Sequence, residues 1–430
     1  MGETRTIAGP GEVLERLAAV PGGPELLALA RQRDDAALIG GAVRDLLCGV
    51  HPRELDVTVA PGGSAEAAAL LAASIPEQRG EEPIEPNLHE RFGTATVAWA
   101  HGRIDIAERR AETYPAPGAL PEVRPGTLEE DLARRDFTVN AITIPLGGPR
   151  RGELIALEHA LDDLMEGRLR VLHEKSFTED PTRMLRMARY QARLALEIEP
   201  RTLELDRTAL SQGALETVSG ARVASELWLF TEEADTKGFE ALGELGVLER
   251  LGLPARYDSE LHGEATWLMP EDGIFEALDL CVLFHPPGGE APPTAESAER
   301  LMEDFEFIAE LRTRLLAGAF GVDRIASGIE AGTSPSELRG LLAGRPPEGL
   351  AIIGALAARR SPAAGKAVAR WLSELRHVVL EIDGGDLLAA GVPEGPEIGQ
   401  RLDRALSMKL DGQLSQGREA ELRAALEVQL

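Results

Sequence analysis

The sequence predicts an α/β head with a small mixed sheet over residues 1–150, followed by an all-α neck, body and tail. Short runs of β-branched and apolar residues, typical of strands, are concentrated before about residue 150, and helical periodicity dominates after it. A segment rich in proline and glycine at residues 285–293 predicts a break in the helical part. We therefore expect a neck and body over 151–285 and a tail over 294–430.

Within the head, the pattern predicts one long helix and several short strands. The helix covers residues 11–32. The strands are expected at residues 36–39, 55–59, 93–99, 103–106 and 138–144. Between residues 111 and 127, repeated prolines with two glycines predict a long irregular loop, which we expect to be mobile near the site.

The first candidate site motif follows the first predicted strand. Gly40 and Gly41 lead into Arg44 and Asp45. A paired glycine that enters a helix can bring backbone N–H groups against a phosphate, and an arginine near the helix start is within reach of a triphosphate. This segment therefore predicts a phosphate site.

The second motif lies on the next predicted strand. Glu54 and Asp56 are two residues apart, so on a strand their carboxylates point to the same face. Hard divalent cations such as Mg²⁺ take oxygen ligands, and this pair could hold one or two of them. The alternative is that both are ordinary exposed strand residues. Together with the paired glycine, the two carboxylates indicate metal-assisted chemistry on a nucleotide.

Two further segments agree with this interpretation. Arg134, Arg135 and Asp136 stand directly before a strand-like run, which suits a triphosphate and a ribose hydroxyl at a strand end. The alternative there is a solvated loop. Farther on, Asp180 precedes Pro181, which predicts the start of a helix.

That helix has one arginine-rich face. Its arginines advance by three or four residues and fall within about a third of the circumference: Arg183, Arg186, Arg189 and Arg193. A basic face of this kind is commonly just solvated. Asp180 and Arg183, with acceptors on one and a rigid fork of donors on the other, could instead meet the hydrogen-bonding edge of a base.

Composition limits the remaining function classes. A formal net charge of −27 argues against a general nucleic-acid binder, and aromatic residues at 4% argue against base stacking as the main source of RNA affinity. Two cysteines form neither a disulfide framework nor a zinc cluster. The sequence has no apolar run near 18 residues and no secretory N-terminus, which predicts a cytoplasmic protein without a membrane span. Nothing in it indicates an oligomeric state.

The ordered motifs resemble those of one family. GGAVRD with ELD, RRDFTVNA, EDPTRMLRMAR and GARVASEL occur in this order over about residues 36 to 227, and the stretch from Ile382 to Gly412 resembles the same family's tail. The sequence is similar to the class II tRNA nucleotidyltransferases (CCA-adding enzymes) and bacterial poly(A) polymerases. The resemblance implies that the mixed sheet of the head is a nucleotidyltransferase sheet.

The resemblance also implies roles for individual residues. Glu54 and Asp56 occupy the positions of the metal-binding carboxylates. Asp105, on another predicted strand, is a candidate third catalytic carboxylate, and the alternative is an ordinary edge-strand aspartate. Asp180 and Arg183 match the pair that selects CTP or ATP. The full set expected to bind nucleotide is Gly40, Gly41, Arg44, Asp45, Arg134, Arg135, Asp136, Asn140, Asp180, Arg183, Arg186 and Arg189.

The implied reaction is attack by the 3′-hydroxyl of an RNA on the α-phosphate of a nucleoside triphosphate, with pyrophosphate leaving and Mg²⁺ as cofactor. The implied partners are the tRNA 3′ end, ATP and CTP. The family pattern usually has aspartate at both metal positions, whereas this chain has Glu54 at the first. Glutamate adds a methylene, and Mg²⁺ tolerates poor octahedral geometry badly, so activity could be lowered.

Several products are compatible with the same motifs. Complete CCA addition is the first expectation, addition of only A or only CC the second, and polyadenylation the third. A catalytically weakened relative that binds tRNA or nucleotide has its only support in Glu54. A purely structural role leaves the ordered arginine and carboxylate motifs unexplained.

Overall fold

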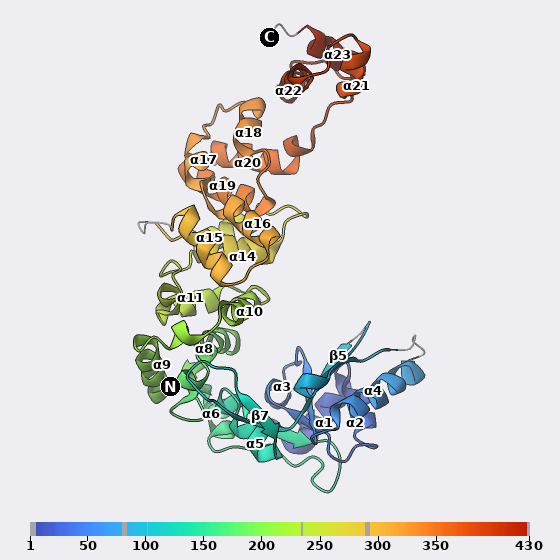
Figure 1. Cartoon of the computed structure of the whole chain (residues 1–430), viewed down its shortest axis with the longest axis vertical. Coiled ribbons are helices and arrows are strands. Elements are labelled where there is room, and N and C mark those ends of the chain that lie inside the picture. Colours follow the sequence, from blue (N-terminus) through green and yellow to red (C-terminus); the bar gives the residue numbers. More distant parts are fainter. Residues whose placement is uncertain (1–5, 80–83, 101, 234, 289–292, 428–430) are drawn as a thin grey trace. The chain divides into compact units, whose positions relative to one another are not determined.

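The computed structural model describes residues 6–79, 84–100, 102–233, 235–288 and 293–427 (Figure 1). Internal packing divides the chain into two units, Met1–Ser219 and Gly220–Leu430. The first unit holds the sheet, and the described residues of the second form helices. The predicted fold class is therefore confirmed, while the limits placed at residues 150 and 285 stay predictions.

The main sheet has seven strands in the order β3-β4-β5-β2-β1-β8-β9. Its strands are β1 (Ala37–Ile39), β2 (Leu55–Val59), β3 (Asn87–His89), β4 (Thr94–Trp99), β5 (Gly102–Glu108), β8 (Ile142–Pro145) and β9 (Ile155–Ala156). β2 and β5 run parallel, and the other neighbouring pairs run antiparallel. The sheet is thus mixed, with the parallel pair near its centre.

Helices cover the sheet, and the first of them differs from the prediction. The single helix expected at 11–32 is wrong, because α1 (Pro10–Ala19) and α2 (Gly23–Leu29) are separate. Gly22 between them has φ +85°, a left-handed conformation that interrupts helical geometry, and prolines flank it on both sides in the sequence. α3 (Gly41–Leu47) packs on β1 and β8, and α4 (Ser64–Arg79) packs on β4 and β5.

The predictions for two further segments of the head also need correction. The segment 111–127 is not a structureless loop: β6 (Arg110–Thr113) and β7 (Glu122–Pro125) form an antiparallel ribbon. Both strands of a two-stranded ribbon are edge strands, and proline, here Pro125, is tolerated in edge strands. The strand expected at 138–144 begins as a 3₁₀ turn, η2 (Thr138–Asn140), and only its second half is the strand β8.

The rest of the first unit is mainly helical. It contains η1 (Glu90–Phe92), α5 (Leu128–Ala133), α6 (Ala160–Glu166), α7 (Ser176–Glu179), α8 (Thr182–Leu194), α9 (Pro200–Ser211) and η3 (Ala214–Thr217). A short parallel pair, β10 (Arg168–Leu169) and β11 (Glu197–Ile198), brackets α8 in the sequence. Strand structure therefore extends past residue 150, contrary to the expectation of helix alone.

The second unit is built from successive helices. They are α10 (Gly220–Thr231), α11 (Lys237–Glu244), α12 (Val247–Arg250), α13 (Ser259–Thr266), α14 (Phe275–Leu283), α15 (Ala295–Asp304), α16 (Ala309–Ala319), α17 (Val322–Gly328), α18 (Pro335–Leu342), α19 (Pro347–Arg360), α20 (Pro362–Ser373), η4 (Leu375–His377), α21 (Gly384–Ala389), α22 (Pro396–Leu410) and α23 (Arg418–Leu426). α19 is largely buried and packs against α13, α14, α16, α17 and α20. None of the helices in the described ranges has the length and apolar content needed to cross a membrane.

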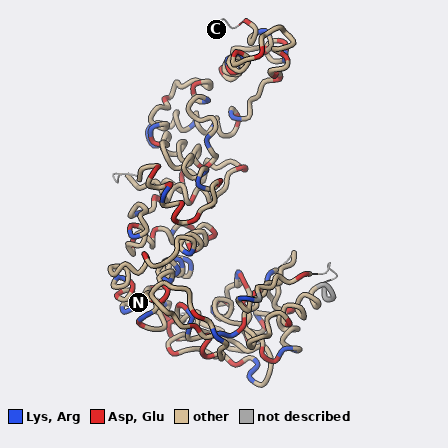
Figure 2. The backbone as a smooth tube through the Cα atoms, in the orientation of Figure 1, with Lys and Arg blue, Asp and Glu red and all other residues tan. Residues whose placement is uncertain are grey.

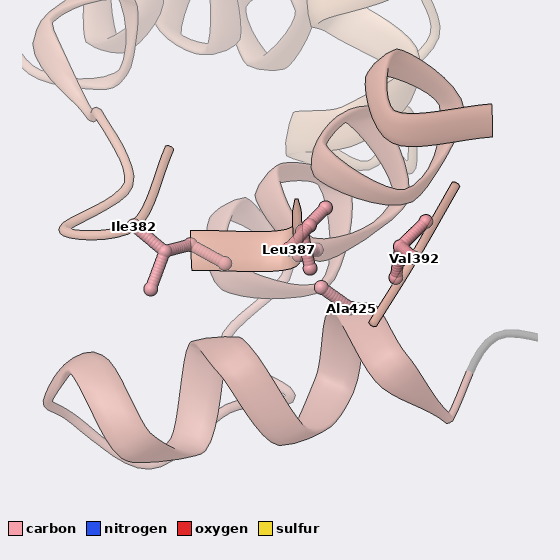
Figure 3. Packing of buried hydrophobic residues seen from close by; sticks show 5 residues of the cluster. Ile382, Leu387, Val392 and Ala425 are labelled. Carbon is pink, nitrogen blue, oxygen red and sulfur yellow. The ribbon is translucent and has the colours of Figure 1, made fainter. Parts of the chain in front are cut away.

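The C-terminal helices have a small hydrophobic core of their own. Its buried members come from the segment before α21, from α21 to α23 and from the connections between them: Ile382, Leu387, Val392, Ala405 and Ala425 (Figure 3). Asp383 caps α21, because its carboxylate accepts the N–H groups of Gly385 and Asp386. This part of the chain therefore carries the hydrophobic contacts needed to hold its three helices together.

Candidate active site

Two aspartates face each other across the parallel strands at the centre of the sheet. Asp56 on β2 lies in register with Asp105 on β5, and Asp105 lies in register with Thr96 on β4. Leu55 and Val57, on either side of Asp56, are buried, so strand alternation turns the carboxylate of Asp56 to the opposite face. Asp105, the candidate third carboxylate, is thus adjacent to Asp56.

Asp105 is held firmly by its neighbours. Thr96 Oγ1 donates to Asp105 Oδ1 at 2.5 Å, and the guanidinium of Arg103 donates from Nε and Nη2 at 2.9 and 3.1 Å. Arg103 is two residues before Asp105, so both side chains lie on the same face of β5. These contacts fix the carboxylate beside Asp56.

Asp56 is the carboxylate most affected by its surroundings. Burial raises the pKa of Asp56 to about 6, with the nearby carboxylates of Glu54 and Asp105 acting in the same direction and Arg135 and Arg103 opposing them. Glu54 is exposed and directly precedes β2. Glu54, Asp56 and Asp105 therefore form a local concentration of negative charge.

These carboxylates fit a hard divalent cation. Oxygen donors from adjacent strands suit Mg²⁺, which commonly uses one or two carboxylates and completes its shell with water and substrate phosphates. In the described part of the chain, no three histidine, cysteine, aspartate or glutamate side chains are arranged to hold a metal ion by themselves. The arrangement is thus a partial shell rather than a closed protein cage.

A hollow of about 470 Å³ opens over this face of the sheet. Both aspartates line it together with several arginines. Its lining includes Asp56, Asp105, Arg103, Arg110, Asp131, Arg134 and Arg135. Acidic and basic residues are interspersed along the coloured part of the tube (Figure 2), and the hollow brings several arginines together beside the two aspartates. The hollow can receive a ligand that carries both metal and phosphate groups.

Carboxylates orient the arginines of the hollow. Arg134 donates to Asp131 Oδ1 from Nε at 3.0 Å and from Nη2 at 2.8 Å, and to Glu112 Oε1 at 3.1 Å. Arg135 Nη2 lies 3.4 Å from Asp131 Oδ2. Asp131 is in α5, three and four residues before these arginines, which is the spacing of neighbours on a helix. The predicted pair of arginines therefore reaches the hollow in a fixed orientation.

Gly40 brings the turn after β1 against the same arginines. It has φ +71°, and a Cβ placed there would lie 2.5 Å from Arg135 Nη1. A side chain at this position would displace the guanidinium of Arg135, and the positive φ itself favours glycine. The predicted glycine turn and the arginine motif are therefore brought together.

Arg44 lies deeper than the sequence indicated. It is 2% exposed; its Nε donates to Asp45 Oδ1 at 2.8 Å, and its Nη1 donates to Asn140 Oδ1 at 2.5 Å. Asp45 is the charge partner of Arg44 in this structure. The guanidinium of Arg44 is therefore packed between α3 and η2.

Asp136 and Asn140 continue this buried network. Asn140 Nδ2 and the backbone N–H of Phe137 both donate to Asp136 Oδ1 at 2.9 Å, and Arg186 Nη1 lies 3.5 Å from Oδ2. Burial alone would raise the pKa of Asp136, but Arg186, Asn140, Arg183 and the N–H of Phe137 together hold it below its ordinary value. Asp136 is therefore a stable anion inside the fold.

The helix predicted after Asp180 is present, but Asp180 is not its N-cap: α8 begins at Thr182, and the capping position is Pro181, which has no side-chain cap. Asp180 is the C-cap of α7, and its Oδ1 accepts from the backbone N–H of Thr182 at 3.2 Å and from its hydroxyl at 2.6 Å. Arg183 is 2% exposed, and its guanidinium donates to the carbonyl oxygens of Arg134 at 3.0 Å and Ser176 at 3.4 Å. Of the predicted base-selecting residues, Asp180 thus lies just before α8 and Arg183 on its first turn, against the arginine motif.

The arginine face of α8 is not solvated. Arg186 lies between Asp136 and Asp180, 3.5 and 3.6 Å from their Oδ2 atoms. Arg189 is 8% exposed and stands over the ring of Tyr190 at 5.0 Å. The alternative of an exposed basic face is therefore wrong for this helix, because carboxylates and an aromatic ring cover it.

The site contains residues that the sequence interpretation missed. Arg103 and Thr96 hold Asp105, Asp131 and Glu112 hold the arginine pair, and Tyr190 packs among arginines. Helical spacing could have shown Asp131, and strand spacing could have shown Arg103. Thr96 and Glu112 come from other strands and had no local signal.

Comparisons with known proteins agree with this geometry. A family model described as the poly(A) polymerase head domain matches residues 36–170. The A-adding tRNA nucleotidyltransferase of Geobacter sulfurreducens is 31% identical over 420 residues, which cover 90% of this chain and 44% of that protein. The chain therefore spans less than half the length of this relative.

A second relative and a solved structure match over most of their length. The CC-adding tRNA nucleotidyltransferase of Deinococcus radiodurans is 34% identical over 354 residues, or 79% of this chain and 83% of that protein. The Thermotoga maritima CCA-adding enzyme complexed with tRNA is 26% identical, covers 99% of both chains and superimposes with a TM-score of 0.72. The chain belongs to the family of tRNA nucleotidyltransferases and poly(A) polymerases.

Proposed function

We propose that the protein is a template-independent RNA nucleotidyltransferase that adds CMP and AMP, from CTP and ATP, to the 3′ end of tRNA. The observation that carries this proposal is the pairing of Asp56 with Asp105 in register on adjacent strands, at a hollow lined by arginines. The names of the similar proteins support tRNA as the substrate class.

In this proposal the oxygen of the RNA 3′-hydroxyl bonds to the α-phosphorus, the bond to the bridging oxygen of the β-phosphate breaks, pyrophosphate leaves, and the hydroxyl proton passes to solvent. Glu54 and Asp56 would hold Mg²⁺, which when bound neutralises phosphate charge, and Asp105 stands beside Asp56 as a further carboxylate. Arg134 and Arg135 hold the departing phosphates in the orientation that Asp131 gives them. Positioning and charge neutralisation supply most of the rate in such transfers.

The remaining residues select and orient the nucleotide. Asp136 stays ionised within its network and accepts a hydrogen bond from a ribose hydroxyl. Asp180, just before α8, and Arg183, on its first turn, present acceptors and donors to the base edge. The protein, rather than a template strand, thereby chooses between CTP and ATP.

The test is transfer of labelled CTP and ATP onto tRNA ending at the discriminator base, in C and in CC, with Mg²⁺. Ordered growth to CCA supports the full proposal. Growth from only one end identifies an A-adding or CC-adding enzyme, and a long A tract identifies a poly(A) polymerase. Asp56→Ala should lower transfer by about 10³-fold, whereas Asp162→Ala, an exposed aspartate on α6, should not change it.

A second candidate is a weakened relative that binds without polymerising, favoured only by Glu54 at the strand start. Glu54→Asp separates the two. If the wild-type protein transfers nucleotide with Mg²⁺, the binding-only candidate is excluded. If only Glu54→Asp transfers nucleotide, the longer side chain of Glu54 is the cause of the lost activity.

A further inference from the structure

Tyr190 is surrounded by arginines from two different elements. The guanidinium carbons of Arg189 and Arg193, on the same helix α8, lie 5.0 and 5.3 Å from its ring centroid. That of Arg44, on α3, lies 5.8 Å from the same centroid. A cation within about 6 Å of a ring is attracted by the negative face of the aromatic system. One ring therefore links the helix after the glycine turn to the arginine face of α8.

A buried aromatic residue packs against the ring of Tyr190. Phe137 is fully buried and meets Tyr190 edge to face, with centroids 5.8 Å apart and an interplanar angle of 88°. Burial raises the pKa of Tyr190, so the phenol stays neutral at ordinary pH. Tyr190 is thus a rigid, uncharged spacer between three like charges.

Arg44 also has two polar partners. Its guanidinium donates to Asp45 on α3 and to Asn140 on η2. The contact with Tyr190 joins Arg44 directly to α8, whose first turn contains Arg183, whereas the polar route from Arg44 to this helix runs indirectly through Asn140, Asp136 and Arg186. A change in the ring should therefore alter the position of Arg44 relative to the base-selecting residues.

We propose that Tyr190 is a positioning residue of the nucleotide site: its ring fixes Arg44 relative to α8, so that the phosphate-binding and base-selecting groups act as one rigid unit. The proposal rests on the proposed nucleotide-binding function. It predicts that Tyr190, without touching the nucleotide, controls both affinity for the triphosphate and the choice between CTP and ATP.

The test compares the full-length chain with Tyr190→Leu and Tyr190→Phe. Loss of the ring should raise the KM for CTP and ATP about tenfold and increase incorporation of the wrong nucleotide, with a smaller change in kcat. Tyr190→Phe keeps the ring and should stay within about twofold of wild type. In an Arg44→Lys background, Tyr190→Leu should have little further effect, because the two act through one contact.

Tyr257→Leu is the matched control. Tyr257 is buried in the second unit and stacks on Phe239 at 4.8 Å, so its loss removes a comparable aromatic contact away from any of these arginines. Its melting temperature should fall while its KM values stay unchanged. Unchanged KM values in Tyr190→Leu, an equal loss in Tyr190→Phe, or additive effects with Arg44→Lys would overturn the proposal.

A separate measurement keeps this inference distinct from the proposed function. If wild type makes no product on any tRNA, the transferase proposal fails. Equilibrium binding of ATP to wild type and to Tyr190→Leu then decides the inference: weaker binding by the variant supports it, and equal binding or no binding by wild type overturns it.

Discussion

Asp206 on α9 is a fully buried carboxylate, and its replacement by asparagine should stabilise the protein in a pH-dependent way. Among the described residues, neither of its oxygens has a hydrogen-bond partner. Burial raises the pKa of Asp206 to about 7, with Arg207 only partly opposing it. Taking this carboxylate out of water without partners costs free energy whenever it must ionise.

The sign and size of this effect on the free energy of unfolding follow from the pKa of Asp206 in the unfolded chain, 3.8, and in the folded protein, about 7. Below pH 3.8 the group is protonated in both states and costs nothing. As pH rises from 3.8 to about 7, the unfolded chain ionises while the folded chain keeps its proton, so stability falls. At 1.36 kcal/mol per pKa unit, the penalty is about 1.5 kcal/mol at pH 5 and about 4 kcal/mol at pH 8.

The assay is urea unfolding of Asp206→Asn followed by circular dichroism at pH 5 and pH 8. The buried amide has its own cost, but that cost does not depend on pH. The gain in unfolding free energy relative to wild type should therefore be about 2.5 kcal/mol larger at pH 8 than at pH 5. Glu204→Gln, an exposed carboxylate on the same helix, should show no such difference. A gain that is equal at both pH values would refute the reasoning.

Three further substitutions test the site. Gly40→Ala should lower kcat/KM at least about tenfold, because its Cβ would lie 2.5 Å from Arg135 Nη1 and displace that guanidinium, whereas Gly62→Ala also has a positive φ but open space around it and should keep activity; equal loss in both would assign the effect to the strain of a positive φ. Asn140→Leu should cost about 3 kcal/mol of unfolding free energy by urea titration, since it leaves two buried charged partners without their hydrogen bond, and a cost below about 1 kcal/mol would contradict the network. Arg183→Ala should relax the choice between CTP and ATP more than it weakens tRNA binding, and equal loss of both by filter binding and transfer kinetics would move Arg183 to the RNA backbone.

Local patterns predicted the parts of the fold that depend on neighbours in the sequence. The strand at 55–59 has the bounds that its β-branched residues indicated, and alternation placed Asp56 on the open face. The start of a helix just after Asp180 followed from Pro181 and is confirmed, but the capping position is Pro181 and Asp180 only accepts the N–H of Thr182 on the first turn. The helix at 11–32 failed because left-handed Gly22 outweighed the apolar spacing around it.

Contacts between distant segments could not be predicted in the same way. Asp56 and Asp105 meet only because β2 and β5 pair in parallel, a choice of topology rather than of local sequence. Arg44 is buried by Asn140, 96 residues away, and Arg183 by a carbonyl 49 residues away. Helical spacing showed that α8 has an arginine face, but the carboxylates of Asp136 and Asp180 that pair with Arg186 lie outside this helix.

These internal partners explain how an acidic chain can present arginines to a polyanion. Arg134 and Arg135 are oriented by Asp131, Arg44 by Asp45, and the cost of fixing these long side chains is met during folding instead of during binding. The paired carboxylates also cancel much of the local positive charge, so a phosphate is bound for matching a fixed set of donors and not for its charge alone. A site built in this way gains discrimination between nucleotides at the expense of general affinity for nucleic acid, which is the balance that a protein selecting CTP or ATP without a template requires.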